Sequence, residues 1–313
     1  MRVLDTSPAA NAAETTASPA ARPAAAAVPL NGAGNTSPDR IGVLLAAATG
    51  LTAEQIERVE HLQRERGMRF GEAAVALGLV SEQDVASALA NQYRYAVITG
   101  RDAKPHASLV MATEPYSEQA EAFRSIRAQL KLKLAAPSAL RRPIAVLSTR
   151  DGDGRSYFAA NLAVAFSQLG ERTLLIDADL RRPSLHELFE LDDETGLSSV
   201  LSGRIEAHTV HRVDGLPHLF VLPVGPIPPN PLELVESVRF ANLLAGVMQK
   251  FDHVIVDTSA FEHGMDGPVV GAHCGLALVV VRAGQSKLAP VQDLIATLAR
   301  GMTDIAGVVL NER

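Results

Sequence analysis

The chain has 313 residues, of which 47% are hydrophobic and 20% are charged, so it can form two domains with a substantial core. Its net charge of −6 argues against a protein that binds nucleic acid through a basic surface, and we expect no nucleic-acid partner. The single cysteine, Cys274, excludes an internal disulfide framework and a cysteine-cluster metal site. Without a signal-peptide pattern or an apolar stretch long enough to span a bilayer, we expect a cytoplasmic protein.

The N-terminal segment has a low-complexity composition. Residues 7–38 hold 12 alanines and 5 prolines, with two charged residues among them. Such a sequence has little apolar side chain to bury and many turn formers. We expect residues 1–38 to form a disordered tail.

Two related segments of 24 residues follow, beginning at Arg40 and Arg69. Each opens on Arg-x-Gly, which places Gly42 and Gly71 at matching positions, and each continues with a Gly-Leu pair before a polar helix start. Apolar residues then recur at helical spacing. The pattern predicts a small helical domain over 39–100.

Residues 101–116 contain two prolines and are expected to be a linker. The rest of the chain, 117–313, begins with a helix over 117–134 and then alternates apolar strands with helices. The expected strands are 144–148, 173–176, 219–222, 254–256, 276–281 and 305–310. The expected helices include 155–169, 231–249 and 287–299. Strands that are apolar throughout are buried on both faces, so we predict a doubly wound, mostly parallel α/β sheet.

The first motif of this domain is a glycine-rich turn, Thr-Arg-Asp-Gly-Asp-Gly-Arg-Ser, over 149–156. Gly152 and Gly154 allow the backbone to turn its N–H groups inward beside a positive helix end, a geometry that holds a nucleotide polyphosphate. Ser156 stands where a Mg²⁺-binding hydroxyl is expected. Arg155 replaces the usual lysine; it keeps the charge, but the two side chains are not interchangeable.

Two further strands end in acidic residues. Asp177 and Asp179 point the same way from an extended chain and are followed by two arginines. They are candidates for holding Mg²⁺ and for accepting a proton from an attacking hydroxyl. Asp257 ends the apolar run 254–256 and is either a helix cap or a further Mg²⁺ ligand.

Several segments of 117–313 resemble the bacterial tyrosine kinases of polysaccharide export. They are LLIDADLRRPSLHELF (174–189), GLSSVLSGR (196–204), PIPPNPLELV (226–235) and GVVLN (307–311). The chain looks most like the EpsG-type kinases of exopolysaccharide loci. The resemblance implies a P-loop NTPase domain of the ParA/MinD type, with Walker A at 148–156, Walker A′ at 174–181 and Walker B at 254–257.

The resemblance also implies the roles of individual residues, with ATP and Mg²⁺ as cofactors. Catalytic roles fall to Asp177, Asp179 and Arg155. Nucleotide contacts fall to Asp151, Gly152, Asp153, Gly154, Arg155, Ser156, Tyr157 and Asn311. The metal ligands are Ser156, Asp177 and Asp257. The Glu-x-x-Arg-x-x-Arg motif of Glu121, Arg124 and Arg127 implies assembly into a homo-oligomeric ring. The alternative is a solvated salt-bridged helix face.

Three departures from the family are visible. Arg155 replaces the Walker A lysine, and Ser259 and Ala260 stand where many relatives have two prolines. The chain stops three residues after Leu310, so we expect the family's C-terminal tyrosine cluster to be missing. The tyrosines that remain are Tyr93, Tyr95, Tyr116 and Tyr157.

The repeated domain resembles the N-terminal domain of type II secretion and pilus ATPases. That resemblance implies a cyclic di-GMP site at Arg40, Gly42, Arg69 and Gly71. A protein-docking domain that has lost the ligand is the alternative.

The sequence therefore predicts a tyrosine autokinase that regulates the chain length or export of an exopolysaccharide. A membrane co-polymerase of the Wzz-like class would be its activator and would recruit it to the inner membrane. The alternatives are a ParA/MinD-like nucleotide switch and an inactive kinase fold that responds to cyclic di-GMP.

Overall fold

The computed structural model describes residues 2–4, 42, 44–46, 49–81, 84–85, 88, 106, 108–134, 141–204 and 210–312. The chain divides into two compact units. One consists of Met1–Thr6 with Tyr95–Arg313, and the other is Ser7–Arg94. We describe each unit by itself.

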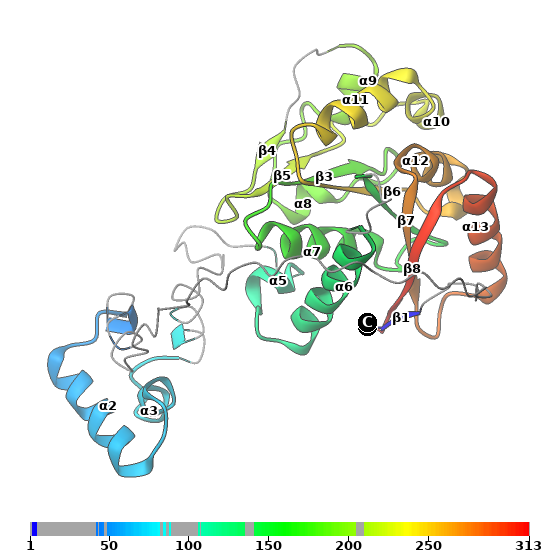
Figure 1. The fold of residues 1–313 in the computed structure, drawn as a ribbon. Coiled ribbons are helices and arrows are strands. Elements are labelled where there is room, and N and C mark those ends of the chain that lie inside the picture. Colours follow the sequence, from blue (N-terminus) through cyan, green and yellow to red (C-terminus); the bar gives the residue numbers. More distant parts are fainter. Residues whose placement is uncertain are drawn as a thin grey trace, which may run out of the picture. The chain divides into compact units, whose positions relative to one another are not determined.

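The larger unit is built on an eight-stranded sheet in the order β1-β8-β7-β2-β6-β3-β5-β4 (Figure 1). The strands are β1 Arg2–Leu4, β2 Ile144–Ser148, β3 Thr173–Ala178, β4 His211–Arg212, β5 Leu219–Leu222, β6 His253–Thr258, β7 Leu276–Arg282 and β8 Asp304–Asn311. All neighbours run parallel except the two edge pairs, β1 with β8 and β4 with β5. The predicted fold class is confirmed.

Helices cover both faces of this sheet (Figure 1). They are α5 Val110–Thr113, α6 Glu118–Leu134, α7 Arg155–Ser167, α8 Leu185–Leu188, α9 Leu197–Leu201, α10 Pro231–Val235, α11 Val238–Met248, the 3₁₀ turn η1 Phe261–His263, α12 Asp266–Cys274 and α13 Leu288–Arg300. Alternate residues of each central strand enter opposite cores, as Leu175 and Ile176 do. One core packs against α5 to α8 and the other against α9 to α13. Burial on both faces explains why the strands are apolar throughout.

The prediction of a disordered tail is wrong for its first residues. Arg2–Leu4 form β1, which pairs antiparallel with β8 so that Val3 lies opposite Val309. Three residues are too few for a period-2 pattern to stand out, and the pairing satisfies backbone groups along the edge of β8. The remainder of the expected tail, 5–38, lies outside the described residues.

The expected linker is also wrong in its second half. Residues 109–112 are buried, and three of them belong to α5. Asn161 of α7 fixes this segment: its side-chain oxygen accepts from the N–H of Met111 at 3.1 Å, and its amide donates to the carbonyl of Ser108 at 2.9 Å. The two prolines led to the prediction of a linker, whereas the apolar side chains of this segment complete the core over α7.

The helix expected over 231–249 is two helices, α10 and α11. Ser237 between them has an extended backbone, with ψ of 148°, and serves as the N-cap residue of α11. Its hydroxyl donates to the carbonyl of Leu234 at 2.7 Å. A serine that satisfies the end of the preceding helix competes with helix continuation.

The smaller unit contains α2 Ala53–Arg66 and α3 Phe70–Ala76. Thr52 caps α2 in a capping box with Gln55, and Gly67 ends it in the left-handed conformation. Gly42 and Gly71 lie close to other side chains: a Cβ at Gly42 would meet the ring of Phe70 at 3.3 Å, and one at Gly71 would collide with Val85. Both glycines therefore serve packing within this unit. Among the described residues, no helix is long and apolar enough to cross a membrane.

Candidate functional site

Three strands bring their carboxyl ends together at one edge of the sheet. Strand β6 lies between β2 and β3, and Asp257 of β6 lies opposite Asp177 of β3 in the register. Strand β2 leads directly into the glycine-rich turn and then into α7. The two sequence motifs that end in acids therefore lie beside the one that carries glycines. In a parallel α/β sheet this edge is where ligands bind.

Asp153 holds the glycine-rich turn in shape from within. Its Oδ2 accepts from the Thr149 hydroxyl at 3.1 Å and from the Arg150 N–H at 2.9 Å. Its Oδ1 accepts from the hydroxyl of Ser286 at 2.8 Å. Asp153 is buried, so these bonds replace its hydration. Asp153 therefore stabilises the conformation of the turn.

The last strand, β8, supports the turn from behind. The side-chain amide of Asn311 donates to the carbonyl of Asp153 at 3.1 Å, and a Cβ at Gly154 would collide with that amide. Gly154 has φ of 93° and begins α7, so it requires both the left-handed conformation and the missing side chain. On the other side, Arg282 donates to the carbonyl of Gly152 at 3.1 Å. Asn311 thus contacts the turn itself.

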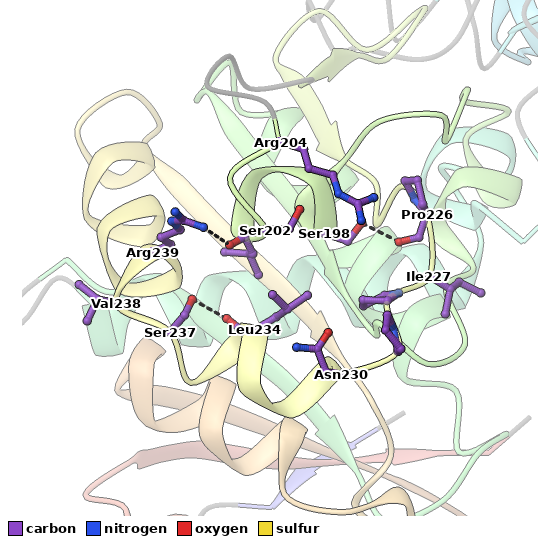
Figure 2. A pocket seen from close by; sticks show the side chains of 13 residues that line it. Ser198, Ser202, Arg204, Pro226, Ile227, Asn230, Leu234, Ser237, Val238 and Arg239 are labelled. Atoms are coloured by element: carbon purple, nitrogen blue, oxygen red, sulfur yellow. Dashed lines mark hydrogen bonds between the residues drawn. The ribbon is translucent and has the colours of Figure 1, made fainter.

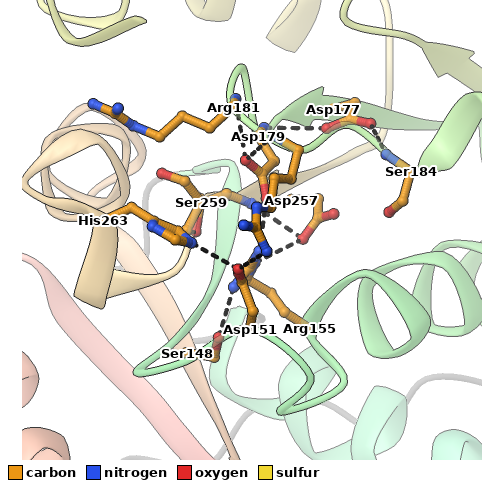
Figure 3. Close-up of polar contacts among 12 residues, drawn as sticks. Ser148, Asp151, Arg155, Asp177, Asp179, Arg181, Ser184, Asp257, Ser259 and His263 are labelled. Atoms are coloured by element: carbon orange, nitrogen blue, oxygen red, sulfur yellow. Dashed lines mark hydrogen bonds and ion pairs between the residues drawn. The ribbon is translucent and has the colours of Figure 1, made fainter.

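The acid cluster consists of Asp177, Asp179 and Asp257, all of them buried (Figure 3). Asp177 is held by backbone: its Oδ2 accepts from the N–H groups of Ser184 and Leu185 at 3.2 and 3.1 Å, and its Oδ1 from that of Asp179 at 3.1 Å. This carboxylate therefore folds the chain after β3 back on itself. Asp179 accepts in turn from two backbone N–H groups, those of residues 181 and 182.

Arg155 inserts its guanidinium into the acid cluster (Figure 3). Nη2 lies 2.7 Å from Oδ2 of Asp179, and Nε lies 3.5 Å from Oδ1 of Asp257. Nη1 donates to the hydroxyl of Ser148 at 2.7 Å. The side chain is only 7% exposed, so it joins the end of β2 to the ends of β3 and β6.

The acids lie in an environment that resists their charge. Burial, reinforced by the charge of Asp257, raises the pKa of Asp177 well above its ordinary value. Burial likewise raises the pKa of Asp257 to about 6, although Arg155 and a hydrogen bond from Ser156 act to lower it. The pKa of Asp179 is raised by burial and lowered in part by Arg155. One guanidinium leaves negative charge in the cluster uncompensated.

The residues present fit a hard divalent cation. Oδ2 of Asp257 is buried and has no hydrogen-bond partner among the described residues. Carboxylates of this cluster and the Ser156 hydroxyl offer the oxygen ligands that Mg²⁺ prefers. A cation there would also offset the burial and the mutual repulsion that raise the pKa values of the acids.

A rim of arginines surrounds the cluster and the turn. Arg181 pairs with Asp266 at 2.5 Å, Arg182 with Asp151 at 2.7 Å, and Arg150 with Glu262 at 3.7 Å. In each pair the arginine is the more exposed partner. The rim therefore presents guanidinium groups outward and keeps its carboxylates deeper.

Glu262 and His263, which follow β6 in η1, were missed by the sequence analysis. With Asp151 they place three potential ligand atoms within 4.8 Å of one another. The His263 ring lies 2.7 Å from Oδ2 of Asp151 (Figure 3), and the N–H of Asp151 donates to Glu262 at 2.7 Å. Both acids already pair with arginines, so this group braces the turn. Glu262 and His263 reach Asp151 only because β6 pairs with β2, and no local sequence pattern indicates this contact.

Tyr157 and the motif residues of α6 have different partners. The ring of Tyr157 packs edge-on against Phe123, with centroids 5.9 Å apart, and its hydroxyl lies 3.4 Å from the side chain of Gln119. The Tyr157 side chain thus packs on α6. Arg124 pairs with Glu121 at 2.9 Å and donates to the carbonyl of Pro115.

Arg127 donates to the carbonyl of Ala165 in α7 at 2.5 Å. Both arginines of the motif therefore contact their own chain, while Glu121 is exposed. Of the four residues expected to bind cyclic di-GMP, Arg40 lies outside the described residues, and Arg69 is the N-cap residue of α3, where its N–H donates to Glu72 at 3.0 Å.

A separate cavity of about 580 Å³ lies beyond the carboxyl end of β5 (Figure 2). The segments 196–204 and 226–235 form much of its wall, together with the start of α11. The hydroxyl of Ser198 joins them by donating to the carbonyl of Pro226 at 2.6 Å. Arg204 and Arg239 are the charged residues of the lining, and no acid of the cluster contributes to it.

Comparison with known proteins places the chain among P-loop NTPases and tyrosine-protein kinases. Residues 139–215 match the family model "ParA: NUBPL iron-transfer P-loop NTPase". The chain is 32% identical over 211 residues to the tyrosine-protein kinase YwqD of Bacillus subtilis, covering 67% of this chain and 88% of the relative. It is 34% identical over 192 residues to the tyrosine-protein kinase ptk of Acinetobacter johnsonii, but there it spans only 26% of the relative's length.

Solved structures give the same picture. The chimerical protein CapA2B2 superposes with a TM-score of 0.62 and 32% identity, covering 72% of this chain and 98% of that one. The kinase domain of the Escherichia coli tyrosine kinase ETK superposes with a TM-score of 0.63 and 29% identity, covering 67% and 82% of the two chains. Both matches are long enough to include most of the larger unit.

Proposed function

We propose a function from one premise: this chain belongs to the bacterial tyrosine kinases of polysaccharide export. On that premise the protein is a tyrosine autokinase, which transfers the γ-phosphoryl group of ATP to tyrosine. The observation that carries the proposal is the placing of three buried carboxylates and one guanidinium under a glycine-rich turn at the strand ends. Catalysis of phosphoryl transfer consists mainly of positioning and charge stabilisation, which such a site supplies.

We propose the following roles, which this geometry supports. Backbone N–H groups of the turn 151–157 would bind the phosphates at the positive end of α7, with Arg155 as the neighbouring cation. Asp177, Asp257 and Ser156 would hold Mg²⁺, which when bound neutralises phosphate charge. Asp179 would orient the acceptor hydroxyl and take its proton. Asn311 would act through the turn, because its amide contacts the backbone there.

The setting of the reaction is also a proposal. The kinase would be of the EpsG type and would regulate the chain length or export of an exopolysaccharide. A membrane co-polymerase would activate it and recruit it from the cytoplasm to the inner membrane, and Glu121, Arg124 and Arg127 would shape a homo-oligomer. The smaller unit would correspond to the N-terminal domain of secretion ATPases, either with cyclic di-GMP as its ligand or as a protein-docking domain that has lost this ligand.

The test is phosphotyrosine formation on the purified full-length chain with ATP and Mg²⁺, followed by mass spectrometry. Asp257→Asn is the decisive variant, because asparagine can keep the bond that Oδ1 accepts from the Thr258 N–H. We expect labelling to fall by at least about a hundredfold, in keeping with the loss of a charged catalytic group. Asp293→Asn, a change of an exposed acid on α13, is the matched control. Undiminished labelling of Asp257→Asn would refute the assignment.

A nucleotide switch of the ParA/MinD type is not favoured, because the relatives that cover most of the larger unit are named tyrosine kinases. Arg150 occupies the place of the signature lysine of those ATPases, and it pairs with Glu262 of the same chain. Phosphotyrosine formation separates the two readings directly.

A further inference from the structure

The kinase function requires a tyrosine that accepts the phosphoryl group. We propose that Tyr116 is the tyrosine that is phosphorylated, and that it is presented to the site of a second copy of the chain. This inference rests on the kinase function proposed above. The chain has four tyrosines, and two of them, Tyr116 and Tyr157, lie in the described residues.

Accessibility distinguishes these two. The side chain of Tyr157 packs on α6 against Phe123, with its hydroxyl next to Gln119. Tyr116 is 56% exposed and lies in the turn that joins α5 to α6. A hydroxyl must enter the site to within hydrogen-bond reach of a base and of the phosphorus, which an outward-facing turn residue allows.

Charge distinguishes Tyr116 from the two tyrosines outside the described residues. The residues around Tyr116 include Glu114, Glu118 and Glu121, all three of them exposed. The sequence around Tyr93 and Tyr95 is basic, with an arginine between them. The rim of the site presents the arginines 150, 181 and 182 outward, each more exposed than its acidic partner. An acidic acceptor segment therefore complements the rim, and a basic one does not.

The anchoring of the turn indicates transfer between copies. The carbonyl of Pro115 accepts from Arg124, and the Ser117 N–H donates to the carbonyl of Glu114 at 3.0 Å. The Ser117 hydroxyl accepts from the N–H of Ala120 at 3.2 Å. These bonds fix the turn at the start of α6, which packs along α7 so that Gln119 lies next to Tyr157 in the first turn of α7. The fixed turn holds Tyr116 at the surface, whereas the acids of its own cluster are buried, so we infer that the exposed phenol enters the site of another copy.

The proposed reaction moves one phosphoryl group from ATP to Tyr116. The phenol oxygen of Tyr116 forms a bond to the γ-phosphorus of ATP as the bond from that phosphorus to the β,γ-bridging oxygen breaks. ADP leaves with the bonding pair, and the phenolic proton passes to a carboxylate of the acid cluster.

The experiment uses a convenient property of the sequence. Cleavage after lysine and arginine places the four tyrosines on four different peptides, so each is scored separately by mass spectrometry. With the wild-type full-length chain, ATP and Mg²⁺, we expect phosphate on the peptide that ends at Arg124. Tyr116→Phe should remove most of the total phosphotyrosine, and Tyr93→Phe combined with Tyr95→Phe should leave it unchanged.

Transfer between copies is tested by mixing two variants. Asp257→Asn retains Tyr116 but lacks the proposed activity, and Tyr116→Phe retains the activity but lacks the acceptor. Phosphate on Tyr116 in the mixture, and in neither protein alone, supports transfer in trans. Its presence in wild type together with its absence from the mixture would overturn that part of the inference.

The charge argument has its own variant and control. Glu114→Gln combined with Glu118→Gln should slow Tyr116 phosphorylation by about three- to tenfold at low salt, with the difference shrinking as salt rises. Glu54→Gln combined with Glu57→Gln makes the same charge change on α2 and should not slow it. Full phosphotyrosine on other peptides with none on Tyr116 overturns the inference but leaves the kinase function standing. Absence of phosphotyrosine on every peptide removes the kinase function, and the inference with it.

Discussion

The guanidinium of Arg155 lies 2.7 Å from Oδ2 of Asp179, and both side chains are almost completely buried. Two further contacts, to Ser148 and Asp257, use the other nitrogen atoms of the same group. Lysine carries its three N–H donors on a single nitrogen, so it does not reproduce the planar spread of the three guanidinium nitrogens that make these contacts. Arg155 is therefore held by residues at the ends of the neighbouring strands β2 and β6 and by Asp179, which follows β3.

Substitution of Arg155 should lower the stability of the protein as well as its activity. Arg155→Ala leaves two buried carboxylates without their cation, and we expect a loss of about 3–5 kcal/mol in the free energy of unfolding. Arg155→Lys should lose about 1–3 kcal/mol, because a buried hydrogen bond is left unmade. Urea unfolding at neutral pH measures both. Arg182→Ala, at an exposed ion pair, should change stability by less than about 1 kcal/mol. A lysine variant as stable as wild type would contradict the role given to the guanidinium.

The stability of the metal-free protein should fall as pH rises through the titration of Asp257. Its pKa is raised from 3.8 to about 6 by burial, so between these values the folded protein holds a proton that the unfolded chain has released. The stabilising contribution is complete below 3.8 and is lost by about pH 6, a change of roughly 3 kcal/mol. Asp177, whose pKa is also raised, acts in the same direction. Unfolding in chelator at a series of pH values measures the slope, and Asp257→Asn should flatten it. An unchanged slope in that variant would show that other groups cause it.

Binding of ADP should stabilise the protein, and part of that effect should require Mg²⁺. At about a hundred times its Kd, a ligand that binds only the folded state contributes about 2.7 kcal/mol, which appears as a rise in Tm. Removing the metal with a chelator should reduce the rise. Asp257→Asn should lose the Mg²⁺-dependent part, whereas Asp293→Asn should keep it. Equal shifts with and without Mg²⁺ in the wild-type chain would argue against a metal at the acid cluster.

Because Gly154 lies against Asn311, alanine should destabilise the protein more at Gly154 than at Gly152. Gly152 and Gly154 both have positive φ, at 81° and 93°, so alanine strains the backbone by a similar amount at each, about 1–2 kcal/mol. A Cβ at Gly152 would meet only Arg282, at 3.9 Å, whereas one at Gly154 would collide with the Asn311 amide. We expect Gly154→Ala to be the more destabilising and to weaken ADP binding more strongly, as thermal shift and calorimetry would measure.

A second substitution completes that comparison. Asn311→Gly removes the obstructing amide, and in this background Gly154→Ala should cost no more than Gly152→Ala. Equal costs of the two alanine variants in the wild-type background would contradict a close approach of β8 to the turn.

Much of the larger unit follows from local sequence. The strands Ile144–Ser148 and Leu219–Leu222 have the expected limits, since a strand buried on both faces must be apolar throughout. Elements whose apolar character is short or interrupted were not foreseen. Arg2–Leu4 depend on pairing with β8, and Val110–Thr113 depend on Asn161, fifty residues away from Met111.

The sequence by itself determined the alternating strands and helices, the glycine-rich turn, and the acids that end two strands, because periodicity, turn chemistry and charge are properties of neighbouring residues. Only the tertiary structure decided how these groups meet. It placed Asp257 between β2 and β3, directed Arg155 into the acids, and set Asn311 and Glu262 against the turn. Strand order brings residues together that are about a hundred or more positions apart, and no local pattern encodes a distance of that kind.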